Sequence, residues 1–385
     1  MFRKKAILSL LSIVLSGIFM FMIFSSSSLG DTLEADIKID GVSGKIYDFT
    51  DKIIGKIYNE PDKEKSVKNL NTKVYLGGYP VGLKLYADGV VVVGTEAVDS
   101  PEGFVNPARK AGIKVGDVIK RVDGKVVRSN NEVSQIIEES KGKDVKIFIQ
   151  RGEKQEEIVF RCEYSISEEK YKAGIWIRDS SAGIGTVTFC TRDGLYASLG
   201  HPVCDIDTKK VLPISQGECT KVRLNGFIKS TSGNAGELCG FLEEKCIGKV
   251  YSNGELGVYG KFSDIPSATL YELASENEVE TGKAVIYTTI ENGCMEQFEI
   301  EIVRINYKSE DNKNLTIKVT DQRLIEKTGG IVQGMSGSPI VQNGKIVGAV
   351  THVFLTDPTG GYGIFASTML ETLITVSEQY LKKAS

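Results

Sequence analysis

Short apolar runs separated by turn residues dominate the chain from about residue 174 onward. The runs GIGTVTFCT (183–191), AVIYTTI (284–290) and FEIEIVRI (298–305) have the length of strands, and Gly, Asn and Ser cluster between such runs. This pattern predicts a mainly β domain over residues 165–385, built as a sandwich or barrel. Helical spacing returns in a last segment, 367–384, through five apolar positions: Met369, Leu370, Leu373, Ile374 and Leu381.

A different pattern lies between Tyr75 and Phe160, where short strand-like runs alternate with two helical segments. The second helix has its own start signal, because Ser129 and Glu132 have the spacing of a capping box. An apolar stripe follows at helical spacing: Val133, Ile136 and Ile137. We therefore expect an α+β domain over residues 71–162, with one face of this helix packed on a sheet.

The N-terminus has the features of a targeting segment. Three basic residues, 3–5, precede an uncharged run of 19 residues from Ala6 to Phe24, close to the length that crosses a bilayer as a helix. The following SSSSLG contains no AxA-like cleavage site, which favours a retained membrane anchor over a removed signal peptide. We expect residues 1–30 to be the anchor or signal and the polar residues 31–70 to be a linker, with the remainder of the chain exported.

Composition and cysteine spacing exclude several function classes. The net charge is −3, and Lys and Arg are interleaved with Asp and Glu, so no nucleic-acid partner is expected. Seven cysteines form no CxxC pair, which argues against a disulfide framework. A zinc site from His201, Cys204, Cys239 and Cys246 lacks the second element that structural sites use. We therefore predict no metal and no cofactor.

The stretch IVQGMSGSPIVQNGKIVGAV (331–350) has the character of a nucleophile loop followed by a hairpin. Ser336 lies between Gly334 and Gly337, so the backbone can turn tightly and expose the hydroxyl. Ser338, two residues further on, is the rival nucleophile, although we interpret it as a structural hydroxyl. The Asn-Gly dipeptide at 343–344 favours a two-residue type I′ turn.

A nucleophilic serine needs a general base and a group that orients the base. The chain has two histidines, His201 and His352. His352 lies on the strand after the nucleophile hairpin, where a substrate-binding edge is expected, so His201 is the better base. Asp321 is the favoured acid, with Asp205 and Asp207 as alternatives.

Longer segments resemble known families. GMSGSP resembles the GDSGGP nucleophile loop of chymotrypsin-like proteases, and the chain order His, Asp, Ser is the same. SLGHPVCDIDTKK, IRDSSAGIGTVTF, IVQGMSGSPI and GAVTHVFLTDPTGGYGIF are similar to the stage IV sporulation protein B family, a PDZ-bearing serine peptidase family of endospore formers. The resemblance runs from about Lys84 to the C-terminus. It implies a chymotrypsin-like double β-barrel peptidase domain over residues 165–385.

The resemblance also implies roles for particular residues. His201 would take the Ser336 proton, Asp321 would hold the imidazole tautomer, and the N–H groups of Gly334 and Ser336 would form the oxyanion hole. The loop 357–363 would line the specificity pocket. Three residues would pair with the substrate backbone: Thr351, His352 and Val353.

Residues 71–162 resemble a bacterial PDZ domain, which binds an extended peptide as an added strand. In this interpretation YPVGLKL is the loop that holds the peptide carboxylate, although it departs from the GLGF form. Three of its residues would bind the peptide: Val81, Gly82 and Leu83.

The resemblance implies an exported endopeptidase of sporulation signalling, anchored in or carried across the forespore membrane. Its substrate would be a regulatory membrane protein of the sigma-factor processing complex in the intermembrane space, and it would also cut itself in the linker before Asn71. The alternative is a catalytically inactive scaffold whose PDZ domain and barrel bind membrane partners.

Overall fold

The computed structural model describes residues 72–265, 269–291, 293–309 and 311–384, all within one compact unit that covers residues 67–385. The predicted anchor (1–30) and linker (31–70) lie outside the described residues. Among the helices that are described, none is long and apolar enough to cross a membrane.

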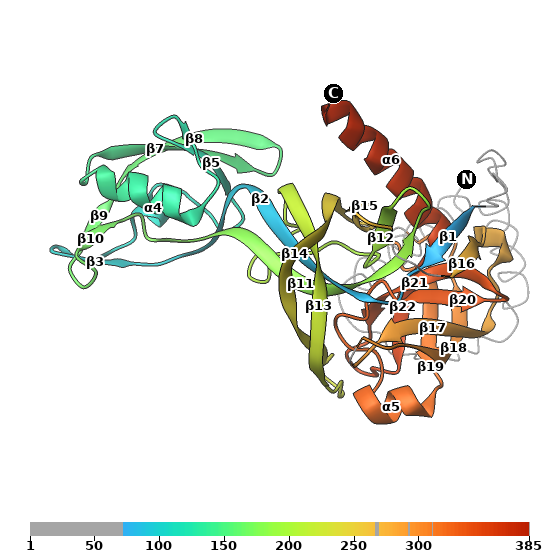
Figure 1. Cartoon of the computed structure of the whole chain (residues 1–385). Coiled ribbons are helices and arrows are strands. Elements are labelled where there is room, and N and C mark those ends of the chain that lie inside the picture. The colour runs from blue at the N-terminus through green and yellow to red at the C-terminus, as the bar shows by residue number, and fades with distance from the viewer. Residues whose placement is uncertain (1–71, 266–268, 292, 310, 385) are drawn as a thin grey trace, which may run out of the picture. The chain divides into compact units, whose positions relative to one another are not determined.

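Strands of the first barrel come from two separated parts of the chain (Figure 1). β2 pairs with β11 and with β13, and the ring closes through β14, β15 and β12 back to β11. A buried cluster that includes Leu83, Val187, Tyr196 and Phe262 fills its interior. The strands are β2 (Pro80–Thr95), β11 (Ile175–Cys190), β12 (Leu195–Ser198), β13 (Ile214–Ile228), β14 (Glu237–Gly254) and β15 (Gly257–Phe262).

The second barrel is also a closed ring. β17 pairs with β18, and the ring continues through β19, β22, β21 and β20 back to β17. The fully buried side chains of Ile286, Phe298 and Ile340 belong to its core. Its strands are β17 (Gly282–Thr289), β18 (Met295–Ile305), β19 (Leu315–Val319), β20 (Pro339–Gln342), β21 (Lys345–Val353) and β22 (Gly360–Phe365). The predicted double β-barrel is therefore present.

Short elements connect and cover the barrels. β1 (Lys73–Leu76) pairs with β11 and with β16 (Leu270–Leu273), which in turn pairs with β21. A 3₁₀ turn, η1 (Glu276–Glu278), and α5 (Gln322–Thr328) belong to the second half of the chain. Asn343 and Gly344 have φ of 51° and 77°, which confirms the predicted turn because a type I′ turn needs φ > 0 at both positions.

The predicted C-terminal helix is α6 (Ala366–Ala384), the red helix in Figure 1. Met369, Leu370 and Leu373 are buried in one core cluster with residues of β1 and β21, as their spacing predicted. Ile374 and Leu381 are instead 47% and 65% exposed. The apolar stripe is thus shorter than the sequence pattern suggested.

The α+β part has its own hydrophobic core, into which Val133 and Ile137 of α4 (Asn130–Glu139) pack. The predicted capping box is present, because Glu132 N donates to Ser129 Oγ and Ser129 N donates to the Glu132 carboxylate. The remaining elements are β3 (Val98–Ser100), β4 (Gly103–Val105), α3 (Pro107–Lys110), β5 (Val118–Val122), β6 (Lys125–Val126), β7 (Asp144–Arg151), β8 (Lys154–Arg161), β9 (Glu163–Ser165) and β10 (Lys170–Lys172).

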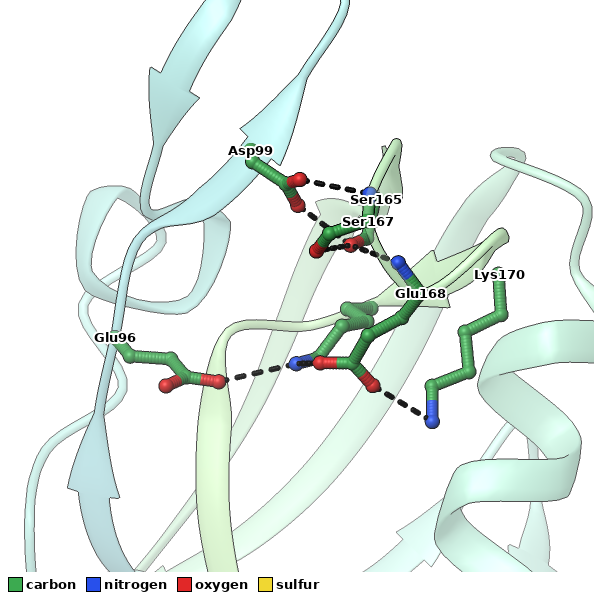
Figure 2. A network of polar contacts seen from close by, with 7 residues as sticks. Glu96, Asp99, Ser165, Ser167, Glu168 and Lys170 are labelled. Carbon is green, nitrogen blue, oxygen red and sulfur yellow. Dashed lines mark hydrogen bonds and ion pairs between the residues drawn. The ribbon is translucent and has the colours of Figure 1, made fainter.

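A polar network ties β3 to the β9–β10 hairpin (Figure 2). The Asp99 carboxylate accepts from Ser165 Oγ at 2.5 Å and from Ser167 N at 2.8 Å, and these bonds lower its pKa to about 2. Lys172 Nζ joins Glu96, at 3.1 Å, to Glu168. These contacts hold the β9–β10 hairpin beside β3.

The predicted peptide-binding residues lie elsewhere than expected. Val81, Gly82 and Leu83 are in β2, where Leu83 is opposite Gly183 of β11 and Cys219 of β13. Their backbone is thus enclosed between two strands of the first barrel, and a peptide strand cannot add there. The assignment of these residues to a PDZ carboxylate-binding loop is wrong.

The long strands β2 and β11 also change the domain limits. Residues 80–87 of β2 pair within the first barrel, whereas Val90 and Val91 pair with β5 of the α+β part. The chain therefore enters the barrel before the α+β part and returns to it through β11. The predicted limits, 71–162 and 165–385, differ from this arrangement.

Candidate active site

The loop that presents Ser336 is held by the first barrel. Thr186 N donates to Ser336 O at 3.0 Å, and Thr186 Oγ1 donates to Gly334 O at 2.7 Å. Thr188 Oγ1 donates to Gly337 O at 2.8 Å. A Cβ at Gly337, whose φ is 95°, would lie 2.0 Å from Thr186 O, so the close approach of the two barrels requires glycine. Ser336 thus lies at the junction of the barrels.

Two backbone amides beside Ser336 are available to an oxyanion. Gln333 O accepts from Leu238 N at 2.8 Å, and because N–H and C=O point in opposite directions across a trans peptide, the Gly334 N–H points away from β14. Among the described residues, neither this N–H nor that of Ser336 donates to a protein acceptor. The φ of Gly334 is 95°, which a residue with a side chain adopts only with strain.

The hydroxyl of Ser336 donates to Thr351 O on β21 at 2.6 Å. This bond fixes the side chain against the edge that was predicted to pair with substrate. The hydroxyl proton is thus engaged by Thr351 O, and this bond must break before a base can take the proton.

A tight turn presents His201 after β12. Leu199 has φ of 64°, and Gly200 N donates to Ser198 O at 2.8 Å, which is the i→i+2 bond of a γ-turn. Non-glycine residues rarely adopt this conformation, and such strain is common at functional sites. His201 Nδ1 bonds to Pro202 O at 2.8 Å. Because a carbonyl only accepts, Nδ1 carries the proton and Nε2 keeps its lone pair for a substrate or a hydroxyl.

Ser336 and His201 line the same cavity, whose volume is about 640 Å³. Thr351, His352 and Val353, the three residues predicted to contact substrate, line it as well. No residue of 357–363 is part of the lining, and the predicted role of this loop in the pocket is wrong. The remaining lining residues are mostly apolar: Leu83, Gly183, Ile184, Leu199, Pro202, Val203, Cys204, Lys209, Ala235, Ile331, Val332, Gln333, Gly334 and Leu355.

Comparison with known families agrees with this geometry. The SpoIVB peptidase S55 model matches residues 169–370, more than half of the chain. The chain belongs to the SpoIVB peptidase S55 family. As a member of this peptidase family it is a serine endopeptidase, and a PDZ model matches residues 106–151.

Solved structures resemble parts of this S55 peptidase. A PDZ domain of an SdrC-like protein from Listeria monocytogenes is 26% identical over 23% of this chain and 87% of its own, with a TM-score of 0.20. The active form of the Rv3671c protease from M. tuberculosis is 16% identical over 51% and 74%, with a TM-score of 0.33. The HtrA-type protease AlgW, solved with a decapeptide, is 12% identical over 52% and 55%, also at 0.33. No curated protein matches the chain.

His352 lies beside His201 in this S55 peptidase. The two imidazole centroids are 4.9 Å apart and their planes are inclined by 38°. Desolvation lowers the pKa of His201 below 6.5, and desolvation together with the charge of His201 lowers the pKa of His352 to about 4. Both rings are therefore neutral at pH 7. Within the described residues, His352 makes no hydrogen bond to Ser336.

Asp321 has partners that differ from the predicted one. Its carboxylate caps α5 by accepting from Arg323 N at 3.0 Å, and it also accepts from Arg323 Nη2 at 2.7 Å and from Glu299 N at 3.2 Å. The Arg323 guanidinium holds the pKa of this carboxyl below its usual range. In this structure no contact joins Asp321 to His201, whose Nδ1 is bound to Pro202 O instead.

The alternative acids are also engaged. Arg178 bonds to Asp205 and, at 2.7 Å, to Asp207. The Asp205 carboxylate further accepts from Thr208 N at 2.8 Å. These bonds hold the loop that follows His201, so both carboxylates position the loop rather than the imidazole.

Two further polar residues near the site, Ser338 and Asn253, form hydrogen bonds that hold its loops. Ser338 is fully buried and donates to Met335 O at 2.6 Å, which agrees with its interpretation as a structural hydroxyl. Asn253 lies near the end of β14. Its side chain accepts from Val203 N at 2.7 Å and donates to Val203 O at 2.8 Å and Leu212 O at 3.1 Å. The loop of His201 is therefore held at both ends by one amide, for which the local turn composition gave no signal.

Proposed function

We propose that this S55 peptidase is an exported endopeptidase of sporulation signalling. It cleaves a regulatory membrane protein between the forespore and mother-cell membranes and cuts itself near its N-terminus. Family membership supports the signalling role, and the basic N-terminus followed by the uncharged run 6–24 supports export or anchoring. The observation that carries the chemistry is that Ser336, His201 and two unpaired amides meet at one cavity.

The catalytic steps follow from these positions. A substrate N–H that donates to Thr351 O competes with the Ser336 hydroxyl and releases it to turn toward His201. Nε2 of His201 then takes the hydroxyl proton as Oγ attacks the scissile carbonyl carbon. The N–H groups of Gly334 and Ser336 stabilise the negative charge that develops on the carbonyl oxygen.

Collapse of this intermediate completes the acylation. The scissile C–N bond breaks, and His201 delivers the proton from Nε2 to the leaving amine. Water then attacks the acyl carbon while His201 takes its proton, the ester bond to Ser336 Oγ breaks as His201 returns the proton to that oxygen, and the carboxylate product leaves. Throughout, the bond from Nδ1 to Pro202 O keeps the imidazole in the required tautomer and stabilises the imidazolium.

Self-cleavage provides the direct test. The purified full chain, incubated alone in detergent, is expected to lose a segment that ends before Asn71, and mass spectrometry of the new N-terminus identifies the cut. Ser336→Ala and His201→Ala abolish this trimming, whereas Ser180→Ala, at an exposed serine outside the cavity, retains it. Trimming that persists in Ser336→Ala would overturn the proposal, and a folded protein that neither trims nor reacts with a fluorophosphonate would favour the inactive scaffold.

A further inference from the structure

Two pairs of apolar side chains, here called the walls, line the cavity near Ser336. Ile331 and Val332 precede Ser336 and are almost completely buried, and Val353 and Leu355 follow the carbonyl of Thr351 that holds the serine hydroxyl. All four line the cavity that Ser336 and His201 share. A substrate whose backbone runs along Thr351 would therefore place a side chain between these walls.

Backbone hydrogen bonds fix the distance between the walls. Gly233 N donates to Leu355 O at 2.7 Å, and Gln333 N donates to Gly236 O at 3.2 Å, so the tip of the β13–β14 hairpin joins both walls. Ala235, within that tip, adds a further small apolar side chain to the lining. The pocket is therefore built before substrate arrives, which favours selection by shape and polarity.

The charge of the lining excludes ionic recognition beside the nucleophile. Among the described residues, no Asp or Glu lines the cavity, and the one lysine or arginine of that lining, Lys209, belongs to the loop after His201 rather than to the apolar walls. A lysine or arginine side chain between the walls would lose its hydration without gaining a counter-charge. An acidic side chain there would also lack a partner.

We infer that this peptidase cleaves after an aliphatic residue, such as Val, Ile or Leu. This inference rests on the proposed function and names the substrate class of the same site. The pocket formed by Ile331, Val332, Val353 and Leu355 takes the side chain of the residue whose carbonyl is attacked. An apolar pocket changes the rate of reaction by about 10–200-fold for each methylene group of the substrate side chain. The rate with an aliphatic residue in this pocket should therefore exceed the rate with a charged residue by at least about 100-fold.

Peptidyl diphenyl phosphonates that differ only in the residue next to phosphorus provide the test on the full chain. The measured quantity is the second-order rate of Ser336 modification, compared with that of a small fluorophosphonate. We expect the Leu and Val reagents to react at least about 100-fold faster than the Lys and Asp reagents. Equal or faster reaction of the Lys or Asp reagent would overturn the inference.

Variants at an exposed wall residue provide the second arm. Leu355 is 58% exposed, so Leu355→Asp should fold, and we expect it to raise the rate of the Lys reagent relative to the Leu reagent at least about 10-fold. Leu381→Asp, at a residue that is 65% exposed on α6 and outside the cavity, should leave the ratio unchanged. An unchanged ratio in Leu355→Asp would also count against the inference. If the fluorophosphonate itself leaves Ser336 unmodified in the wild type, the proposed function fails as a whole.

Discussion

Replacement of Asp321 by Asn separates two roles for this carboxylate. In a Ser-His-Asp triad, Asn in place of Asp lowers kcat about 10⁴-fold because the neutral amide favours the wrong histidine tautomer. In the structure, Asp321 instead caps α5 and binds Arg323, and Pro202 O holds the His201 tautomer. Asn caps a helix as well as Asp does, so the structure predicts a rate of Ser336 modification close to that of the wild type.

The change in the free energy of unfolding of Asp321→Ala gives an independent test of the capping role. Asp321→Ala removes the acceptor of the Arg323 N–H at the start of α5, and loss of such a cap costs about 1 kcal/mol. We therefore expect Asp321→Ala to unfold at lower denaturant concentration than Asp321→Asn, while its residual folded fraction still reacts with the fluorophosphonate.

The assay is the second-order rate of fluorophosphonate modification at pH 7, measured with the chemical denaturation curve of each variant. Asp357→Asn, at an exposed aspartate that bonds to Thr359, is the matched control. A loss of about 10³-fold or more in a fully folded Asp321→Asn protein would refute the reasoning. It would mean that the active arrangement brings this carboxylate to His201.

Three further predictions concern the same site. Since desolvation lowers the pKa of His201 below 6.5, the rate of Ser336 modification should rise with pH to a plateau, with its midpoint below 6.5. The folded protein should lose stability as pH falls through this range, because the unfolded chain binds the proton first. A midpoint above 6.5 would contradict this prediction. Asn253→Ala should slow modification by up to about 100-fold by releasing the loop of His201, whereas a rate equal to that of the wild type would exclude a positioning role. Gly337→Ala should lower the free energy of unfolding by about 2–5 kcal/mol, because its φ is 95° and the added Cβ would clash with Thr186 O. Gly344→Ala, with φ of 77° but open space around it, should cost only about 1–2 kcal/mol. Equal costs for the two variants would refute the close approach of the barrels at Gly337.

Local signals were sufficient for most elements of the fold. The capping box at Ser129 and the Asn343-Gly344 turn depend on neighbouring residues, and both are present in the structure. Alternation of apolar residues predicted the strands for the same reason. The prediction that His201 acts with Ser336, 135 positions later in the chain, came from motif resemblance and the scarcity of histidines, not from periodicity.

The segment YPVGLKL shows an assignment that local sequence patterns could not make. Its residues have strand propensity and a glycine, which suits a peptide-binding loop as well as a barrel strand. The partners that decide between these are Gly183 and Cys219, about 100 or more positions away in the chain. Strand propensity does not identify the neighbouring strand, and β2 continues from one core into another without a break.

The residues around Asp321 also fit the start of a capped helix, a pattern that competes with a catalytic role. Asp321 is followed by QRLIEKT and then by Gly329, and Asp before a short helical run with glycine after it is the pattern of a capped helix. The structure has this helix, with Gly329 at φ of 77° as its C-cap. The group that orients His201 is a backbone carbonyl, and since every residue has one, side-chain identity cannot reveal it. The carboxylate of Asp321 is instead engaged in holding α5 to β18, because it caps the helix and accepts from Glu299 N.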